Sequence, residues 1–122
     1  DGVKSDVSLM TAEMDWLKTQ ATAVADSSPI ALFCHHPLNP NARKYRIANA
    51  DDVLGIFKGK RLRLVASGHW HGNQVERADG ILFTTTACCT STRNNFDDTR
   101  EKGYRLFHLG SDSVETEFVV VE

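Results

Sequence analysis

The chain has 122 residues, of which 41% are hydrophobic and 25% are charged, values that are ordinary for one small globular domain with a workable core. Its net charge of -2 argues against a protein that binds nucleic acid through a basic field, so we expect no nucleic-acid-binding face. No apolar run approaches the roughly 20 residues that a membrane-spanning helix needs, and we expect no membrane span.

The three cysteines, Cys34, Cys88 and Cys89, lack Cys-x-x-Cys spacing, and we expect them to act as small buried hydrophobes. This usage favours a reducing compartment such as the cytoplasm. The chain begins at Asp1 without a methionine, so we expect it to be excised from a longer protein. A targeting signal would then precede Asp1, and the sequence leaves the compartment open.

The first predicted element is a helix that ends near residues 26–29, where a Ser-Ser-Pro run follows an aspartate. Thr11 or Ser8 is the expected N-cap. Apolar side chains recur at spacings of three and four and should form one stripe facing the core, made of Met10, Met14, Leu17, Ala21 and Val24.

A strand, a helix and a second strand follow within about forty residues. Residues 30–34 and 62–67 are short apolar runs, typical of strands that are buried on both faces. Between them, Asn49 is the expected N-cap of a helix over residues 50–58, and Gly59 should end it. This order predicts a right-handed crossover between two parallel strands.

The remainder of the chain predicts antiparallel hairpins, which completes an α/β fold class. Residues 88–102 are polar and too numerous for a simple turn. The hairpins are residues 73–77 with 81–86 around the turn Asp79-Gly80, and residues 104–109 with 114–121 around residues 110–113.

Histidines follow both predicted parallel strands, at the sheet edge where open α/β sheets bind ligands. His69 and His71 should point to the same side of an extended backbone. Because neighbouring strands lie only ~5 Å apart, His35 can meet them around one centre, which predicts a metal site. His36 should point away from it, and His108 should be a structural histidine with satisfied hydrogen bonds.

Two segments resemble the last signature segments of the calcineurin-like metallophosphoesterases: Cys34-His35-His36-Pro37 and Gly68-His69-Trp70-His71. The stretch from Glu13 to Lys18 is similar to the helix that precedes the first of them. The Asp-x-His, Gly-Asp and Gly-Asn-His segments that open the family's domain are absent from this sequence. The resemblance implies that residues 1–122 form the C-terminal portion of one such domain, the C-terminal half of a four-layer sandwich.

The resemblance also implies a function, the metal-dependent hydrolysis of phosphate esters as a phosphatase or phosphodiesterase. Two ions, chosen among Mn, Fe, Zn, Co and Ni, would lie ~3.5–4 Å apart and hold the nucleophilic hydroxide. His35 and His69 would bind one ion and His71 the other, and no side chain here is assigned a catalytic role. The missing N-terminal half would supply the other ligands. We therefore expect this chain alone to be inactive and to self-associate.

The sequence assigns no substrate-binding residue, and the phosphate-ester substrate stays open. Trp70 should pack inward or wall the site. Two alternatives remain: a self-contained zinc domain with one ion on His35, His69 and His71, and a non-catalytic interaction module on the same scaffold. Some loop residues near the predicted site suit either a phosphate contact or ordinary solvation, namely Arg43, Lys44, Arg46, Arg93, Asn94 and Asn95.

Overall fold

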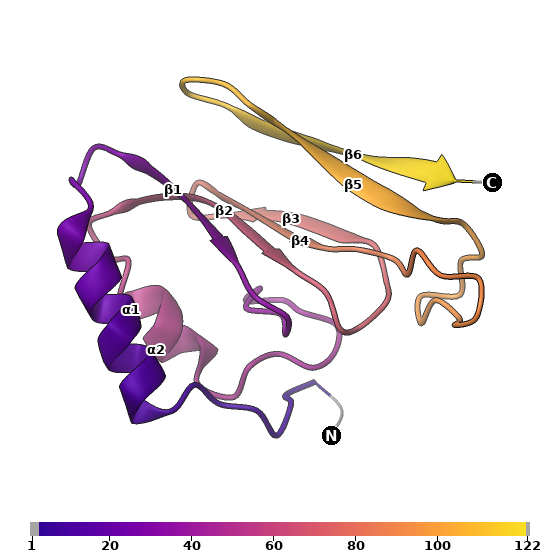
Figure 1. Ribbon diagram of the computed structural model, residues 1–122, viewed down its shortest axis with the longest axis horizontal. Helices are drawn as coiled ribbons and strands as arrows, with labels where there is room; N and C mark the ends of the chain where they lie inside the picture. The colour runs from indigo at the N-terminus through magenta and orange to yellow at the C-terminus, as the bar shows by residue number, and fades with distance from the viewer. Residues whose placement is uncertain (1–2, 122) are drawn as a thin grey trace.

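The computed structural model describes residues 3–121 and arranges them in layers (Figure 1). Two helices cover one face of a four-stranded sheet, and a two-stranded hairpin lies over the other face. The predicted α/β fold class is confirmed, as a mixed sheet with helices and a small antiparallel sheet. The elements are α1 (Thr11–Ala23), β1 (Pro29–Phe33), α2 (Ala50–Gly55), β2 (Arg61–Ser67), β3 (Gln74–Ala78), β4 (Ile81–Thr85), β5 (Lys102–Leu109) and β6 (Val114–Val121).

The sheet has the strand order β1-β2-β4-β3, and both β1 and β4 run parallel to β2. The predicted crossover between parallel strands is thus confirmed. β3 pairs antiparallel with β4 through Asp79 and Gly80, whose φ angles of 53° and 76° suit a tight two-residue hairpin turn. The parallel strands bring the carboxyl ends of β1, β2 and β4 to one edge of the sheet.

Helix α1 begins as the apolar stripe predicts, but its N-cap is Met10, not Thr11 or Ser8. The Met10 N–H donates to the Glu13 carboxylate at 2.7 Å, which satisfies this end of the helix without a hydroxyl cap. Met10 itself is exposed, so its predicted place in the stripe is wrong. The buried positions of the stripe are Leu17 and Ala21.

Helix α2 ends at Gly55, earlier than the predicted Lys58, and turns continue to Gly59, where φ is +80°. Asn49 is the N-cap as predicted, but its side chain does not cap the helix. Its amide bonds Leu9 twice, accepting from the N–H and donating to the carbonyl at 3.0 Å each, which ties the segment before α1 to α2. Neither of these helices, the two in the described range, is long and apolar enough to cross a membrane.

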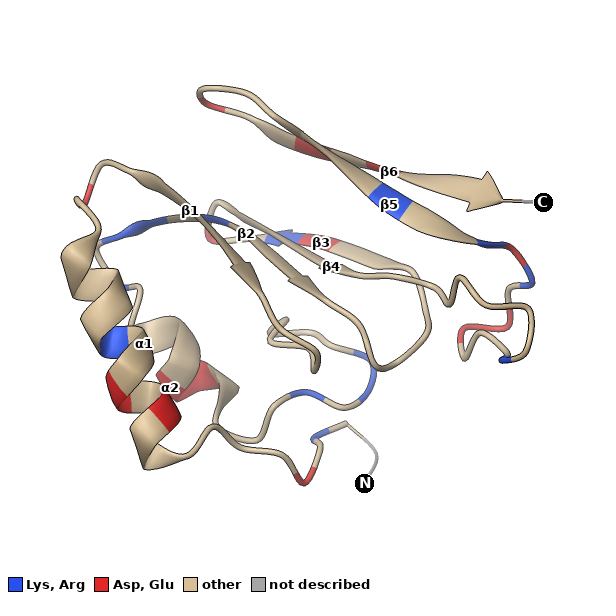
Figure 2. Ribbon diagram, in the orientation of Figure 1, with Lys and Arg blue, Asp and Glu red and all other residues tan. Residues whose placement is uncertain are grey.

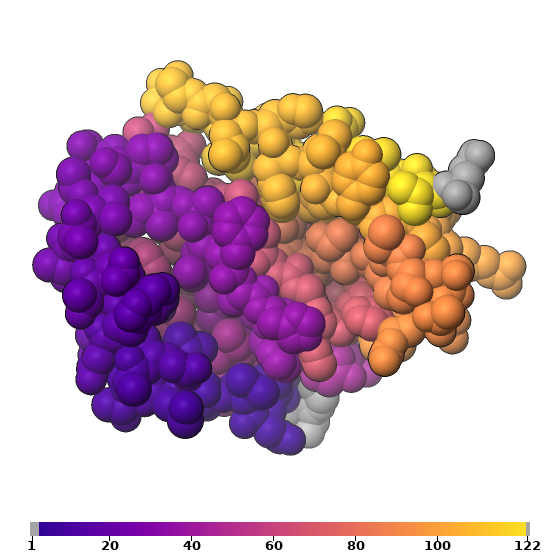
Figure 3. All heavy atoms as spheres, viewed as in Figure 1, coloured from indigo at the N-terminus to yellow at the C-terminus, as the bar shows by residue number. Residues whose placement is uncertain are grey.

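Strand β1 lies at the edge of the sheet, so the prediction that it is buried on both faces is wrong. Its side chains alternate, with Ala31 and Phe33 exposed and Phe33 retaining 66% of its surface. The apolar run predicted the strand correctly but not its position, because composition does not distinguish an edge strand from a central one. In the space-filling view, the purple atoms of β1 and the segment after it lie uncovered (Figure 3).

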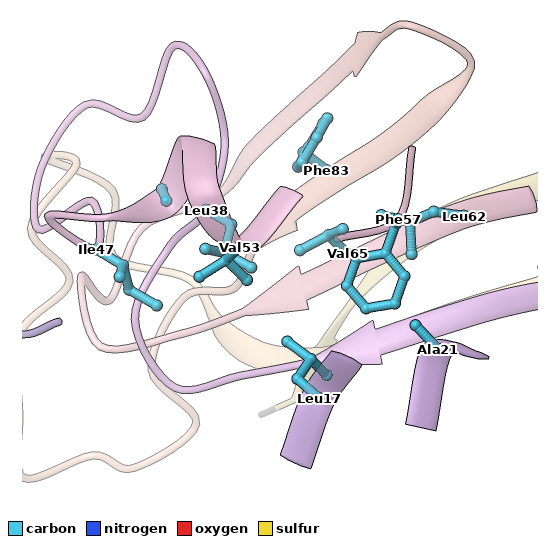
Figure 4. Close-up of a cluster of buried hydrophobic side chains, with 10 residues drawn as sticks. Leu17, Ala21, Leu38, Ile47, Val53, Phe57, Leu62, Val65 and Phe83 are labelled. Atoms are coloured by element: carbon cyan, nitrogen blue, oxygen red, sulfur yellow. The ribbon is translucent and has the colours of Figure 1, made fainter. Parts of the chain in front are cut away.

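The main core lies between the helices and the sheet (Figure 4). It draws on both helices, the loop after β1 and the central strands, and positions the edge of the sheet that carries the histidines. Its buried members are Leu17, Ala21, Leu38, Ile47, Ala50, Val53, Phe57, Leu62, Val65 and Phe83. A second, smaller cluster joins the sheet to the hairpin: Leu64, Ala66, Leu82 and Val114, with Phe107 packed against it.

Candidate metal centre

The loops that follow β1 and β2 lie side by side at the carboxyl edge of the sheet. The Gly68 N–H donates to the His35 carbonyl at 3.0 Å, which continues the parallel pairing one step beyond the strands. His35 and His69 therefore leave the sheet at neighbouring points, as the topology predicts.

The rings of His35 and His69 meet edge on, with an interplanar angle of 76°, and His35 Nε2 lies within hydrogen-bond distance of His69 Nδ1, at 3.1 Å. His36 joins them, because its ring stacks on that of His69 with centroids 4.2 Å apart and an interplanar angle of 29°. The prediction that His36 points away is wrong. Residues 35 and 36 form a bend, so the alternation of an extended strand no longer applies to them.

His71 has a different neighbour. Its ring stacks on Phe96, with centroids 5.0 Å apart and an interplanar angle of 12°, and its Nδ1 is buried without a hydrogen-bond partner. His69 and His71 have φ angles of 62° and 56°, so the extended backbone assumed for this pair is wrong. Left-handed backbone is uncommon for residues other than glycine, although histidine adopts it more readily than most, and such strained positions cluster at functional sites.

Trp70 lies between these histidines and is 2% exposed, which confirms that it packs inward. Its ring lies so close to Gly72 that a Cβ there would come within 2.4 Å of it. Gly72 is therefore required for the tryptophan to turn into the core, and this turn separates His69 from His71. The Arg43 guanidinium lies over the indole ring, 4.8 Å from its centroid.

The electrostatics favour neutral rings at His69 and His36. Burial lowers the pKa of His69, and the nearby His36, His35 and His71 charges lower it further. Burial, followed by the charge of His35, also lowers the pKa of His36. Neutral imidazole is the form that binds metal ions. Burial raises the pKa of the Cys34 thiol to about 11, so this cysteine stays protonated, in keeping with the expected hydrophobic role.

Of the basic loop residues, Arg46 is buried and supports the loop itself. Its Nε donates to the carbonyls of Leu38 and Asn39, and its Nη2 pairs with Asp51 at 2.8 Å. Arg43 and Lys44 are exposed. Arg46 is thus occupied by protein partners, whereas Arg43 lies at the rim of the histidine loops.

In the second loop, Asn95 is buried and bonded within the loop, whereas Arg93 and Asn94 are exposed. On strand β5, His108 is exposed and its Nε2 meets the Glu117 carboxylate at 3.0 Å, away from the histidine cluster. His108 thus has a partner on the neighbouring strand.

Two aromatic residues at the site were missed by sequence reasoning. Tyr45 places its ring edge on to His69, with centroids 4.8 Å apart, and has a φ of 61°. Phe96 stacks on His71 from the loop before β5. Both contacts span more than twenty residues of chain and leave no local pattern, so no sequence signal would have found them.

The spacing between the ring nitrogens of His35 and His69 suits two ligands of one metal ion. A metal–imidazole bond is ~2.0–2.1 Å long, so two ring nitrogens on one ion lie about 2.9–3.4 Å apart at bond angles between 90° and tetrahedral. The 3.1 Å between His35 Nε2 and His69 Nδ1 falls within this interval. Within residues 3–121, however, no three His, Cys, Asp or Glu side chains are arranged to hold an ion. Among the described residues, this spacing therefore suits two ligands of one ion and no third ligand joins them.

Comparison with protein-family models and with curated proteins finds no match for this chain.

Proposed function

We propose that this chain contributes histidine ligands to a metal centre that hydrolyses phosphate esters, as in the calcineurin-like metallophosphoesterases that it resembles. The observation that carries the proposal is the facing pair of ring nitrogens, His35 Nε2 and His69 Nδ1, at the carboxyl ends of two parallel strands. His71 follows two residues later and has a buried, unpartnered Nδ1. Buried polar atoms normally have a bonding partner, so a metal ion would satisfy this nitrogen.

In this proposal, the chain's own residues would bind the metal ions and orient the substrate. Lowered pKa values keep His69 and His36 neutral at neutral pH, and a neutral imidazole binds a cation without cancelling its charge. When bound, two divalent or trivalent ions (Mn, Fe, Zn, Co or Ni) would supply Lewis acidity and a hydroxide nucleophile. Arg43, fixed over Trp70 at the rim, would attract the phosphate.

The other ligands would come from a second polypeptide segment, which the resemblance identifies as the N-terminal half of such a domain. The open edge of β1 supports this view, because a strand paired parallel to β1 would end beside His35. An apolar groove of about 460 Å³ adjoins that edge, lined by Trp16, Leu32 and Phe33 among others. With that segment the layers would complete a four-layer sandwich. Without it, the exposed edge would favour self-association of this chain.

A second candidate function is a self-contained zinc module with a single ion. In this alternative one ion would be held by His35, His69 and His71, and the close approach of His35 Nε2 and His69 Nδ1 within one chain supports it. Such a module would bind one ion per chain and would need no second segment. The stoichiometry of metal binding in the active assembly therefore separates the two candidates.

Calorimetric titration of the chain with Zn²⁺ tests the metal site. His35→Ala and His69→Ala should each weaken binding by more than the ~10–100-fold that loss of a residue supporting a ligand costs. His108→Ala is the matched control, because His108 lies on the exposed face of β5 with Glu117 as its partner. Unchanged affinity in both His35→Ala and His69→Ala would refute the metal site.

A chromogenic phosphate ester tests the need for the second segment. We expect no measurable turnover by this chain alone, because a single weakly held ion lacks the double clamp on the phosphoryl group. Turnover that a chelator and His69→Ala both abolish would contradict this expectation and would favour the self-contained zinc module.

A further inference from the structure

The loop between β4 and β5 is polar, but its shape is fixed by one buried amide. Asn95 Oδ1 accepts from the Cys88 N–H at 3.0 Å, and Asn95 Nδ2 donates to Thr99 Oγ1 at 3.1 Å and to the Glu101 carbonyl at 2.7 Å. These bonds join the two ends of the loop. The next residue, Phe96, therefore follows a residue whose position is fixed by these hydrogen bonds.

This loop meets the histidine loop at two adjacent positions. The Phe96 N–H donates to the His71 carbonyl at 2.9 Å, while the two rings stack almost parallel. The Asp97 carboxylate accepts from the Asn73 N–H at 2.8 Å, two residues after His71. The backbone of His71 and the plane of its ring are thus held by one loop.

Burial does not explain the position of Phe96, because its side chain is 51% exposed. A phenyl ring left half in water gains only part of the stabilisation that full burial would contribute. His71 also has a left-handed backbone, which persists only where its surroundings enforce it. The stacking on His71 is the interaction that accounts for the exposed position of Phe96.

We infer that Phe96 is a positioning residue that fixes the ring orientation of His71 for metal binding. This inference rests on the proposed function. The ring of a histidine can turn over about its terminal torsion and exchange the places of its two nitrogens. A stacked phenyl ring at 12° opposes the tilt which that turn requires, so the same ring nitrogen would stay available to an ion bound at this site.

The test is a Zn²⁺ titration of Phe96→Ala, Phe96→Tyr and Val75→Ala, combined with NMR signals of the His71 ring. Val75 is the matched control, since it is also 51% exposed and lies on β3. Phe96→Ala should weaken Zn²⁺ binding by ~10–100-fold, the usual cost of losing a residue that orients a ligand. It should also remove the ring-current shift of the His71 ring protons. Phe96→Tyr should retain both properties.

Equal Zn²⁺ affinity and an unchanged His71 ring signal in Phe96→Ala would overturn the inference. So would a thermal midpoint far below that of Val75→Ala together with failure of Phe96→Tyr to restore binding, because Phe96 would then only support the fold. His71→Ala separates this failure from that of the proposed function. If His71→Ala binds Zn²⁺ as the parent chain does, the assignment of His71 as a ligand fails first.

Discussion

The two faces of the four-stranded sheet are covered very differently. On the helix side, ten buried residues from helices, loops and strands form one cluster, whereas the hairpin side has four. Adjacent residues on the same strand serve opposite faces, since Phe83 packs under the helices and Leu82 packs under the hairpin. The helix side therefore provides most of the buried apolar contact that stabilises the sheet, and the hairpin side provides less.

Arginines compensate for the small cluster under the hairpin. Arg61 Nη2 bonds the Ser111 carbonyl and pairs with Asp112, and Arg63 Nη2 bonds the Asp112 carbonyl, each at 2.9 Å. Arg77 bonds the Val114 carbonyl at 2.7 Å. Figure 2 marks basic positions in blue on the ribbon of β2 and β3. Polar bonds to the turn of the hairpin thus add to the small apolar contact beneath it.

Phe83→Ala should have the largest effect on stability. Its ring is 1% exposed in the main core, and such a truncation costs about 3–5 kcal/mol through lost burial and an unfilled cavity. That loss approaches the whole stability of many small domains. Urea unfolding followed by circular dichroism measures it. A cost below that of the neighbouring Leu82→Ala would reverse the comparison between the two faces.

Leu82→Ala should cost less, about 2–3 kcal/mol, although Leu82 is also 1% exposed. The hairpin can move toward the sheet and partly fill the space, because few buried residues hold it away. Amide hydrogen exchange should therefore become faster in β5 and β6 and change little in α1. Faster exchange in α1 to the same degree would show that the two faces form one cooperative unit.

Local patterns predicted the elements of the fold, because period and turn chemistry are properties of neighbouring residues. The Asp79-Gly80 hairpin and the crossover are examples. Long-range properties were not predictable in this way. The exposure of Phe33 depends on strand order, and the stacking of Phe96 on His71 joins segments twenty-five residues apart. His35 and His69 were found because the ends of parallel strands converge by topology, whereas ring directions in left-handed loops follow no period.

Arg61→Met should weaken the attachment of the hairpin turn by less than about 1 kcal/mol. Asp112 is almost fully exposed, and exposed ion pairs contribute little to stability. The effect should be local, as faster amide exchange at residues 110–113 without a change in the unfolding midpoint beyond that of Lys58→Met. Lys58 is a suitable control because it is exposed near the end of α2. Protection of the turn that survives Arg61→Met would assign the attachment to the small apolar cluster alone.

The smallest effect depends on pH and concerns the bond from the Asn73 N–H to the Asp97 carboxylate. This bond ties the loop before β5 to the segment before β3, and we call it the joint between the sheet and the hairpin. Burial raises the pKa of Asp97, but hydrogen bonds from Thr99 and Asn73 outweigh it and leave this pKa below the ordinary 3.8. A lowered pKa in the folded state means that the ionised carboxylate adds stability above about pH 4, and this stability is lost as the pH falls through the folded pKa.

The Asn73 amide should therefore exchange faster in acid, after correction for the intrinsic rate, while amides in α1 keep their protection. Asp97→Asn keeps an acceptor oxygen but does not titrate, so it should remove the pH dependence of Asn73 exchange. A loss of protection at the same pH in Asp97→Asn would show that another group controls the joint. Exchange at Asn73 that follows α1 at every pH would mean that the hairpin side opens only when the helix side unfolds.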